Sequence, residues 1–319
     1  MELYIMKMGP AFVDYLWGGT RLVTEFGKQT DLERVAESWE ISCHPAGLST
    51  VENGAWAGRT LAAVLADHPK LAGTKASAFP GFPILVKLID AKQDLSLQVH
   101  PGDEYAMKVE GETGKNEMWY VMDCDPGAEI ILGFRHPISR ETFRKGIEEN
   151  TILEDVNRIP VQRGDCFCIP AGMIHAIGKG MLIAEVQQSS NVTYRVYDYD
   201  RRGADGNPRE LHIEKALDVT DTSVTGGRVT TQPVPVGGGR VRQLTDWEYF
   251  SARELQIDGE MPLNCGADSF HSMVCVAGEL TLRAGEEALS LCRGESVFVP
   301  AGLGQYSIAG AGAVLFTQI

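Results

Sequence analysis

One stretch of the sequence occurs twice, and this repeat constrains the fold more than any other feature. Residues 164–175 align without a gap on residues 294–305, at an offset of 130 residues. Each copy reads Gly, an acidic residue, four strand-forming residues and Pro-Ala-Gly, and then, after two more residues, His175 in the first copy and Gln305 in the second. The glycine and the Pro-Ala-Gly turn delimit a short strand, and the residue that follows begins the next one. The chain is therefore predicted to contain two copies of one β-rich unit.

The pattern of the first copy, G-x5-P-x-G-x2-H, resembles the second motif of the cupin barrels. Elsewhere the chain consists of short β-branched or aromatic runs divided by glycine and proline, which favours an all-β barrel or sandwich. We therefore expect a mainly β fold of two tandem cupin (jelly-roll) barrels with a few helical additions on the first. Because the second copy has Gln305 at the position of His175, only the first barrel is expected to bind a metal.

Helix signals are few and local. Thr60 and Ser139 stand directly before segments with helix-forming character and predict N-caps for helices at 61–68 and 140–150. A third short helix is expected at about 214–219. These helices are additions to the β framework and do not change the predicted fold class.

The best candidate for a linker is residues 221–240, which are rich in glycine, threonine, valine and proline. We predict a metal-binding catalytic cupin domain over residues 1–225, with a helical insertion at about 136–158. A degenerate C-terminal cupin domain without metal ligands is predicted over 226–319.

Charge and cysteine usage exclude several classes of partner. The formal net charge of −14 repels nucleic acid and acidic lipid surfaces, and no run approaches the length of a membrane span. No secretory signal is recognised at the start of the sequence. The seven cysteines are odd in number and lack CxxC spacing, which favours reduced thiols over a disulfide framework. We therefore expect a cytoplasmic protein whose partner is a small molecule rather than nucleic acid or membrane.

Four side chains from three segments form a candidate metal site. Gln98 and His100 are two residues apart, so they project from the same face of a strand. Glu117 begins a later strand-like run, and His175 follows the repeat turn. Two imidazoles, a carboxylate and an amide oxygen suit zinc, although iron or manganese would accept the same ligands. Taken singly, His100 could be a loop histidine and His175 a core histidine that donates to a carbonyl.

Motifs over nearly the whole chain also resemble the class I mannose-6-phosphate isomerases, in the compact bacterial form. One departure is visible, because longer members read His-Lys-Pro-Glu where this chain has Gly114-Lys115-Asn116-Glu117. A mechanism that relies on the missing histidine cannot operate here. The motifs that carry the resemblance are Trp17-Gly18-Gly19, Glu37-Ser38-Trp39-Glu40-Ile41-Ser42, Pro83-Ile84-Leu85-Val86-Lys87, Leu95-Ser96-Leu97-Gln98-Val99-His100-Pro101, Lys115-Asn116-Glu117 and residues 187–198.

The resemblance implies a role for each candidate residue. It implies one Zn²⁺ per chain bound by Gln98, His100, Glu117 and His175, with Arg195 and Lys115 as catalytic residues and Ser96, Lys87 and Lys115 as substrate-binding residues. The residues themselves agree in part. Ser96 shares a strand face with Gln98, and Lys87 ends an apolar run where an ammonium group needs an anionic partner such as a phosphate. Arg195 taken alone would more simply form a salt bridge with Asp198 or Asp200.

The implied activity is the reversible isomerisation of mannose 6-phosphate to fructose 6-phosphate, by metal-assisted proton transfer through a cis-enediol. Two other classes stay open from the sequence. A non-haem iron cupin oxygenase uses a similar set of two histidines and a carboxylate. A cupin pair can also bind a sugar without transforming it.

Overall fold

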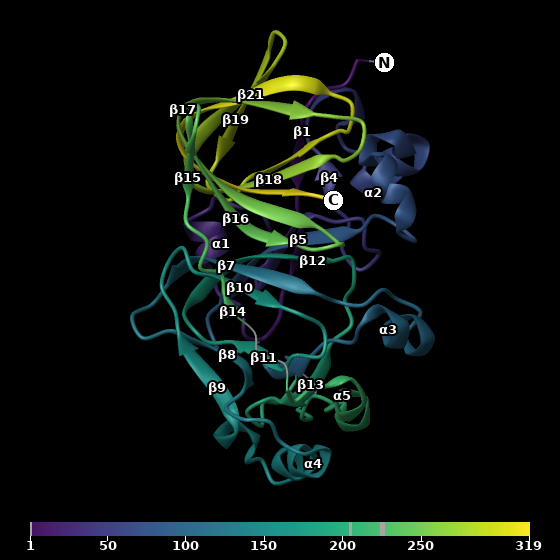
Figure 1. Cartoon of the computed structure of the whole chain (residues 1–319), viewed down its shortest axis with the longest axis vertical. Helices are drawn as coiled ribbons and strands as arrows, with labels where there is room; N and C mark the ends of the chain where they lie inside the picture. The colour runs from purple at the N-terminus through teal and green to yellow at the C-terminus, as the bar shows by residue number, and fades with distance from the viewer. Residues whose placement is uncertain (1, 204–205, 224–226) are drawn as a thin grey trace.

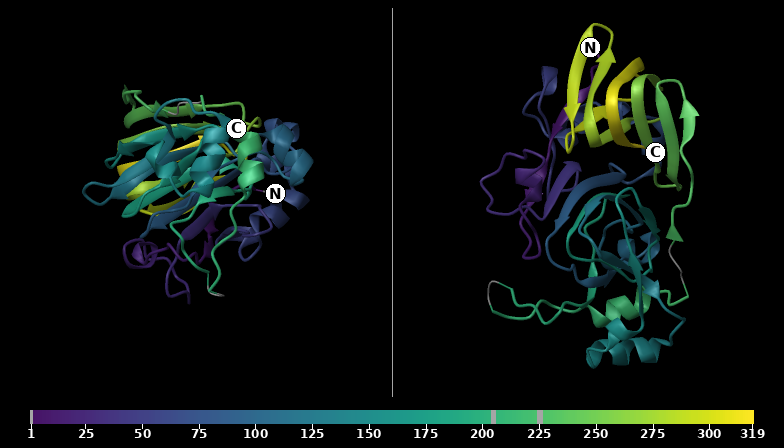
Figure 2. Two further views of the ribbon diagram at one scale, coloured as in Figure 1. Left: turned by 90° about the horizontal axis from the view of Figure 1, so that it is seen from below. Right: turned by 90° about the vertical axis from the view of Figure 1, so that its left-hand side faces the viewer.

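The computed structural model describes residues 2–203, 206–223 and 227–319, and it is built from antiparallel sheets stacked in layers (Figures 1 and 2). A seven-stranded sheet has the order β14 (Gly227–Arg228), β10 (Cys166–Ile169), β7 (Glu117–Cys124), β12 (Met181–Gln188), β5 (Ile84–Ala91), β3 (Glu37–Ile41) and β2 (Ala11–Val13). A five-stranded sheet has the order β13 (Tyr194–Tyr197), β6 (Leu97–Val99), β11 (His175–Ile177), β8 (Glu129–Phe134) and β9 (Val156–Pro160).

A nine-stranded sheet forms the upper part of Figure 1. Its order is β15 (Val234–Val236), β16 (Gly239–Asp246), β17 (Ser251–Cys265), β21 (Gly304–Gln318), β18 (His271–Ala284), β20 (Ser296–Val299), β1 (Met6–Gly9) and β4 (Thr50–Val51), with β19 (Glu287–Cys292) paired to β18. The long strands β17, β18 and β21 fold this sheet around an apolar interior of its own, which includes Leu255, Leu282 and Ile308. The fold is therefore mainly β, and the prediction of two tandem cupin barrels is confirmed.

The first barrel lies between the seven-stranded and five-stranded sheets. In strands that are buried on both faces, successive side chains point alternately into two apolar layers. In β7, Trp119 and Val121 face the barrel interior, whereas Met118 and Tyr120 pack against the second barrel. The outer face of the five-stranded sheet is covered by α4 (Arg140–Glu148) and α5 (Ile213–Val219), at the lower end of Figure 1. This layering leaves the interior between the two sheets as the place where polar side chains can converge.

The second barrel takes in strands from the start of the chain. Strand β1 pairs with β20, with Met6 opposite Phe298, and β4 extends the same edge. The predicted boundary at 225/226 lies outside the described residues, and the division into 1–225 and 226–319 stays a prediction. Within the predicted linker at 221–240, β14 pairs with β10 of the first barrel, whereas β15 and the first residues of β16 belong to the second.

The three predicted helices are present. Helix α2 (Leu61–Asp67) begins with the Thr60 side chain accepting a hydrogen bond from the backbone N–H of Ala63, at 3.2 Å. Helix α4 begins in the same way, with Ser139 Oγ accepting from the N–H of Thr142 at 3.0 Å. Helices that we did not predict are α1 (Arg21–Thr24), α3 (Asp103–Val109) and the 3₁₀ turns η1 (Gly54–Trp56), η2 (Pro69–Ala72), η3 (Thr74–Ala78) and η4 (Ile152–Glu154). In the described part of the chain, no helix has the length and apolar character needed to cross a bilayer.

Candidate active site

Three side chains predicted as metal ligands converge inside the first barrel. His100 follows β6 directly, Glu117 is the first residue of β7, and His175 is the first residue of β11. The two Nε2 atoms are 3.1 Å apart, and the Glu117 carboxylate oxygens lie 3.3 Å from His175 Nε2 and 3.4 Å from His100 Nε2. All three side chains are buried. They come from three separate segments of the chain, and their ligand atoms lie close together.

The hydrogen bonds around the histidines direct their free nitrogens at each other. His100 Nδ1 lies 2.8 Å from the carbonyl of Val192, and His175 Nδ1 lies 2.8 Å from the carbonyl of Met173. Because a carbonyl only accepts, each Nδ1 carries the hydrogen, and each Nε2 presents a lone pair. Among the described residues, neither carboxylate oxygen of Glu117 has a hydrogen-bond partner. Lys115 Nζ lies 3.2 Å from one of these oxygens as an ion pair. Two imidazole lone pairs and a carboxylate that face one another fit a cation at their centre.

The electrostatics of the site favour the forms that bind metal. Burial, together with the positive charge of Lys115, lowers the pKa of His100 to about 3, and burial also lowers the pKa of His175. Burial by itself would raise the pKa of Glu117, but Lys115 and the two histidines hold it well below its usual value. Neutral imidazoles and an ionised carboxylate are the protonation states in which these side chains coordinate metals.

Gln98 lies at the edge of this group. It is opposite His175 in the pairing of β6 with β11, and its Nε2 is 3.4 Å from His175 Nε2. Rotating the terminal amide by half a turn would present Oε1 to the same point, since the two ends of the group occupy equivalent positions. Gln98 is thus placed where an oxygen ligand would be needed, and its role as a ligand stays a prediction.

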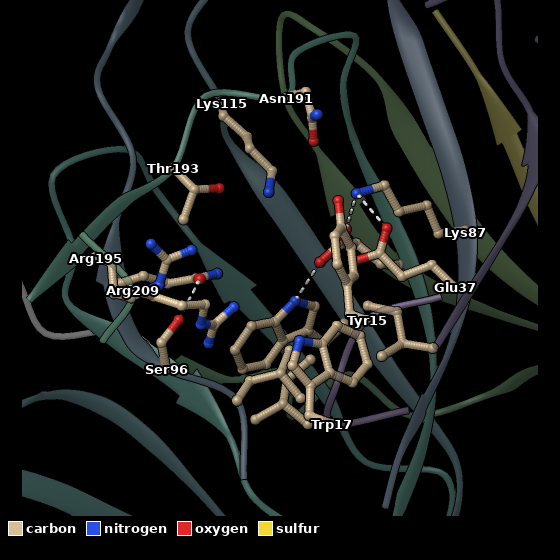
Figure 3. A pocket seen from close by; sticks show the side chains of 16 residues that line it. Tyr15, Trp17, Glu37, Lys87, Ser96, Lys115, Asn191, Thr193, Arg195 and Arg209 are labelled. Carbon is tan, nitrogen blue, oxygen red and sulfur yellow. Dashed lines mark hydrogen bonds and ion pairs between the residues drawn. The ribbon is translucent and has the colours of Figure 1, made fainter. Parts of the chain in front are cut away.

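A polar cavity of about 240 Å³ opens beside these residues (Figure 3). Every residue predicted to contact substrate reaches it, namely Lys87, Ser96, Lys115 and Arg195, and Gln98 borders it as well. Ser96 Oγ is 3.5 Å from Gln98 Oε1, in agreement with their predicted common strand face. The cavity is also lined by side chains that the sequence did not single out for function, namely Tyr15, Trp17, Glu37, Ile89, Leu95, Trp119, Ile177, Glu185, Asn191, Thr193 and Arg209.

Lys87 finds its anionic partners within the protein. Its ammonium group is 3.3 Å from Glu37 and 3.6 Å from Glu185, and it lies over the ring of Trp39 at 4.8 Å from the centroid. Burial acts to lower the pKa of Lys87, but the two carboxylates outweigh it and raise the pKa above its ordinary value. The cost of burying Lys87 is therefore offset without a phosphate.

Glu185 is a further ionisable group of the cavity that our sequence reasoning missed. Its carboxylate accepts a hydrogen bond from the indole N–H of Trp119 at 2.9 Å. Burial, and next the negative charge of Glu117, raise the pKa of Glu185 to about 7. A signal was available, because Lys87 and Glu185 are single charged residues within apolar strand runs, and such residues are rarely buried without a partner.

Arg195 does not form the salt bridge that its sequence neighbours favour. Asp198 instead pairs with Arg201 and Arg209. The Arg195 guanidinium donates from Nη1 to the carbonyl of Glu210 at 2.9 Å, and its buried Nε has no partner in the described part of the chain. Burial, and then the positive charge of Arg209, lower the pKa of Arg195.

The second barrel has a histidine and a tyrosine where the first barrel has metal-ligand candidates. The repeat aligns Ile169 of the first barrel with Val299 of the second. Ile169 is paired across the sheet with Glu117, and Val299 is paired with His271. His271 therefore occupies the position in the second barrel that Glu117 occupies in the first. Gln305, however, is exposed. Its neighbour Tyr306 is buried, and the phenol oxygen lies 2.7 Å from His271 Nδ1. Gln305 therefore aligns with His175 in sequence but does not take its place in the barrel.

Comparisons with known proteins agree with this architecture. Residues 5–127 match the family model for the catalytic domain of phosphomannose isomerase type I, and residues 241–319 match the model for the cupin domain of mannose-6-phosphate isomerase. The chain is 37% identical to mannose-6-phosphate isomerase ManA of Bacillus subtilis over 94% of both chains. It is 40% identical to mannose-6-phosphate isomerase of Streptococcus mutans over 89% of both.

Among solved structures, the crystal structure of mannose 6-phosphate isomerase from Bacillus subtilis superposes with a TM-score of 0.92 and 34% sequence identity, over 99% of each chain. The sequence relatives span almost the full length of both partners, and the solved structure reproduces the two-barrel arrangement. The chain therefore belongs to the type I mannose-6-phosphate isomerase family.

Proposed function

We propose that this protein interconverts mannose 6-phosphate and fructose 6-phosphate by proton transfer between C2 and C1 of the open-chain sugar, through a cis-enediol. The observation that carries the proposal is the convergence of His100, Glu117 and His175. Gln98 and Lys115, which contact this group, line a cavity that Arg195 also borders. The reaction places negative charge on a sugar oxygen, and a cavity that gathers cations opposes that cost.

One zinc ion per chain is the metal that we propose for the site. The two histidines and Glu117 would hold it with Gln98 as a fourth ligand, where it would supply positive charge to the sugar oxygen that becomes negative. Two nitrogen donors and two oxygen donors fit zinc, which does not require a thiolate. Because the ligand atoms of the three ionisable side chains lie within 4.8 Å of one another, binding needs no rearrangement of the strands.

Lys115 and Arg195 are the catalytic residues of this proposal. Lys115 Nζ lies 3.2 Å from the Glu117 carboxylate, and the Arg195 guanidinium borders the same cavity. Both add positive charge to the cavity in which the enediolate forms, and Lys115 is one group able to carry the proton. Glu185 is the other, because it is a carboxylate at the same cavity whose burial raises its pKa and so favours proton uptake.

Substrate binding is assigned to Ser96, Lys87 and Lys115. An ammonium group has three N–H donors, so the two carboxylates at Lys87 leave one for a sugar hydroxyl. The Ser96 hydroxyl lies beside Gln98 and can bind substrate at the edge of the metal site. All seven cysteines are free thiols, which supports a reducing compartment such as the cytoplasm.

The decisive measurement follows loss of deuterium from C2-labelled mannose 6-phosphate by NMR, with the zinc-loaded protein under anaerobic conditions. We expect exchange with solvent together with formation of fructose 6-phosphate. An iron oxygenase would be inactive without oxygen, and a binding module would leave the label in place. Exchange no faster than in a metal-stripped control would contradict the proposed isomerase activity.

Metal content tests the ligand set separately. His175→Ala removes one of the three converging ligands and is expected to lower bound zinc at least about 10-fold, by analogy with losses on disturbing metal sites. Gln305→Ala is the matched control, because this residue aligns with His175 in the repeat and is exposed in the second barrel. Elemental analysis of both purified variants is the measurement. Equal zinc loss in the two would contradict the prediction that only the first barrel binds the metal.

A further inference from the structure

We infer that the phosphate group of the sugar substrate binds at the end of the cavity formed by Arg195 and Arg209, and that Arg209 selects for phosphorylated sugars. The inference rests on the proposed isomerase function and extends it to a residue with no role assigned above. It also locates the phosphate away from Lys87.

Among the residues that the structure describes, the charges at this end of the cavity do not balance. Three arginines gather around Asp198, which is 6% exposed, and Asp198 forms ion pairs with Arg201 and Arg209. Arg195 has no carboxylate partner in the described part of the chain. Arg195 and Arg209 both border the cavity. A phosphate monoester carries a charge of about −1.5 to −2 at pH 7, which offsets the two positive charges left over.

Unused donors point to the same place. Arg195 borders the cavity and uses Nη1 for the carbonyl of Glu210, which leaves Nη2 without a partner among the described residues. Asp198 accepts hydrogen bonds from Nε and Nη2 of Arg209, which leaves Nη1 to bind a ligand. The hydroxyl groups of Ser96 and Thr193 border the cavity beside the two guanidinium groups (Figure 3). Guanidinium and hydroxyl donors together are the groups that bind phosphate oxygens in proteins.

The opposite end of the cavity is unfavourable for a phosphate. There Lys87 lies between Glu37 and Glu185, so one positive charge faces two carboxylates. A dianion would be repelled by this arrangement, whereas sugar hydroxyls can bind to it. The substrate is therefore oriented with its phosphate toward Arg195 and Arg209 and its hydroxyl groups toward Lys87.

Asp198 gives Arg209 a fixed orientation. The carboxylate engages two nitrogens of the guanidinium group, which is the fork-to-fork geometry that holds an arginine in one plane. Asp198 itself follows β13, the strand that carries Arg195. The two arginines are thus held relative to each other before substrate arrives, which lowers the entropy cost of binding.

The test replaces Arg209 by glutamine in the zinc-loaded enzyme. We expect Arg209→Gln to raise the KM for mannose 6-phosphate about 10- to 100-fold, as for loss of a charge-assisted hydrogen bond, with kcat within threefold of wild type. Competitive inhibition by inorganic phosphate should weaken by the same factor, while slow isomerisation of unphosphorylated mannose should not change. Arg209→Lys, which keeps the charge but not the fork, should fall between wild type and Arg209→Gln.

Arg202→Gln is the matched control. Arg202 is an exposed arginine of the same loop, and its Nη1 donates to the carbonyl of Gly206 rather than facing the cavity. Zinc content should be the same in all variants, and the melting temperature of Arg202→Gln should equal that of wild type.

A KM and a phosphate inhibition constant within twofold of the Arg202→Gln values would overturn the inference and leave the isomerase function standing. A fall in kcat at unchanged KM would also overturn it. If wild type shows no exchange at C2 and phosphate binding, measured by calorimetry, still depends on Arg209, the proposed function fails and the anion site stands.

Discussion

At the scale of single residues, the interior of the first barrel is a set of buried charges that each require a particular neighbour. Lys87 lies between Glu37 and Glu185, and Glu185 also accepts the indole N–H of Trp119. Cross-strand pairing sets this arrangement, since Glu185 is opposite Lys87 on one side and opposite Trp119 on the other. Removing one member leaves the others buried without compensation.

The first prediction concerns Lys87. Lys87→Met keeps the length of the side chain and removes its charge, so Glu37 and Glu185 are left buried and close together. We expect the free energy of unfolding to fall by about 3–5 kcal/mol, as for a buried ion pair that loses one partner. Urea denaturation at matched zinc content measures the loss. The double variant Lys87→Met, Glu37→Gln should recover part of it, and a loss below about 1 kcal/mol in the single variant would contradict this account.

The residues of this site differ in whether the sequence alone could identify them. Gln98 and His100 were identifiable because spacing by two residues is local, and His175 because it belongs to a repeat. Glu185 had a sequence signal as a lone charge in an apolar run, but that Glu37, Glu185 and Arg209 lie in one cavity was not predictable, because their proximity depends on strand register or on the path of a loop. Register is set by tertiary packing, which a single sequence does not display.

At the scale of elements, local rules were sufficient for some helices and failed for others. Helices α2 and α4 were predicted from their caps, because a serine or threonine that accepts a backbone N–H acts over three residues. Helix α3 has a weaker signal, namely Asp103 and Glu104 in its first turn, and its Met107 and Val109 are exposed instead of forming an apolar stripe. Without that stripe, the pattern does not distinguish α3 from a loop.

The second prediction tests a cap. Ser139→Ala removes the acceptor for the N–H of Thr142 at the start of α4, and it should lower the free energy of unfolding by about 1 kcal/mol. The catalytic constants should not change, because α4 lies on the outer face of the five-stranded sheet. Chemical denaturation and the isomerase assay measure the two effects. Ser139→Asp retains the cap and should stay within about 0.5 kcal/mol of wild type; an equal loss in both variants would show that the hydrogen bond is not the cause.

The third prediction concerns His271 in β18. Burial lowers the pKa of His271 to about 4, with Asp268 and Arg253 as the nearby charges that act on it in opposite directions. The unfolded chain takes up a proton near pH 6.5 and the folded chain only near pH 4, so the stability contributed by neutral His271 is complete above pH 6.5 and is lost as the pH falls toward 4. A shift of this size corresponds to at most about 3 kcal/mol.

Denaturation at pH 7 and pH 5 measures this effect. The wild type should lose about 2 kcal/mol more than His271→Gln between the two values, because the variant has no imidazole to protonate. Comparing the two proteins cancels the other groups that titrate in this range. Parallel losses in wild type and variant would show that His271 does not contribute.

At the scale of the whole molecule, the two barrels form a single folded unit. One apolar core lies between the seven-stranded and nine-stranded sheets, and it includes Met118 and Val186 from the first barrel and Phe250 and Leu315 from the second. The repeat predicted two barrels, but it did not predict that β1 would join the second. A four-residue strand has no sequence signal for a partner at the other end of the chain.

The fourth prediction follows from this shared core. A chain truncated after residue 223 lacks the second barrel, so β1 loses its pairing with β20 and the outer face of the seven-stranded sheet is exposed to water. We expect this fragment to be insoluble or to unfold without cooperativity, and to bind no zinc. Thermal unfolding followed by circular dichroism tests this. A fragment that unfolds cooperatively and retains metal would show that the first barrel folds by itself.

The pairing of Met6 with Phe298 also bears on how the protein is made. Ribosomes add about 5–20 residues per second, so β1 leaves the ribosome roughly 15–60 s before β20 does. During that interval β1 can pair with β4, but the edge that faces β20 in the folded protein has no native neighbour, as in an edge strand open to intermolecular pairing. The second barrel can therefore close only near the end of translation.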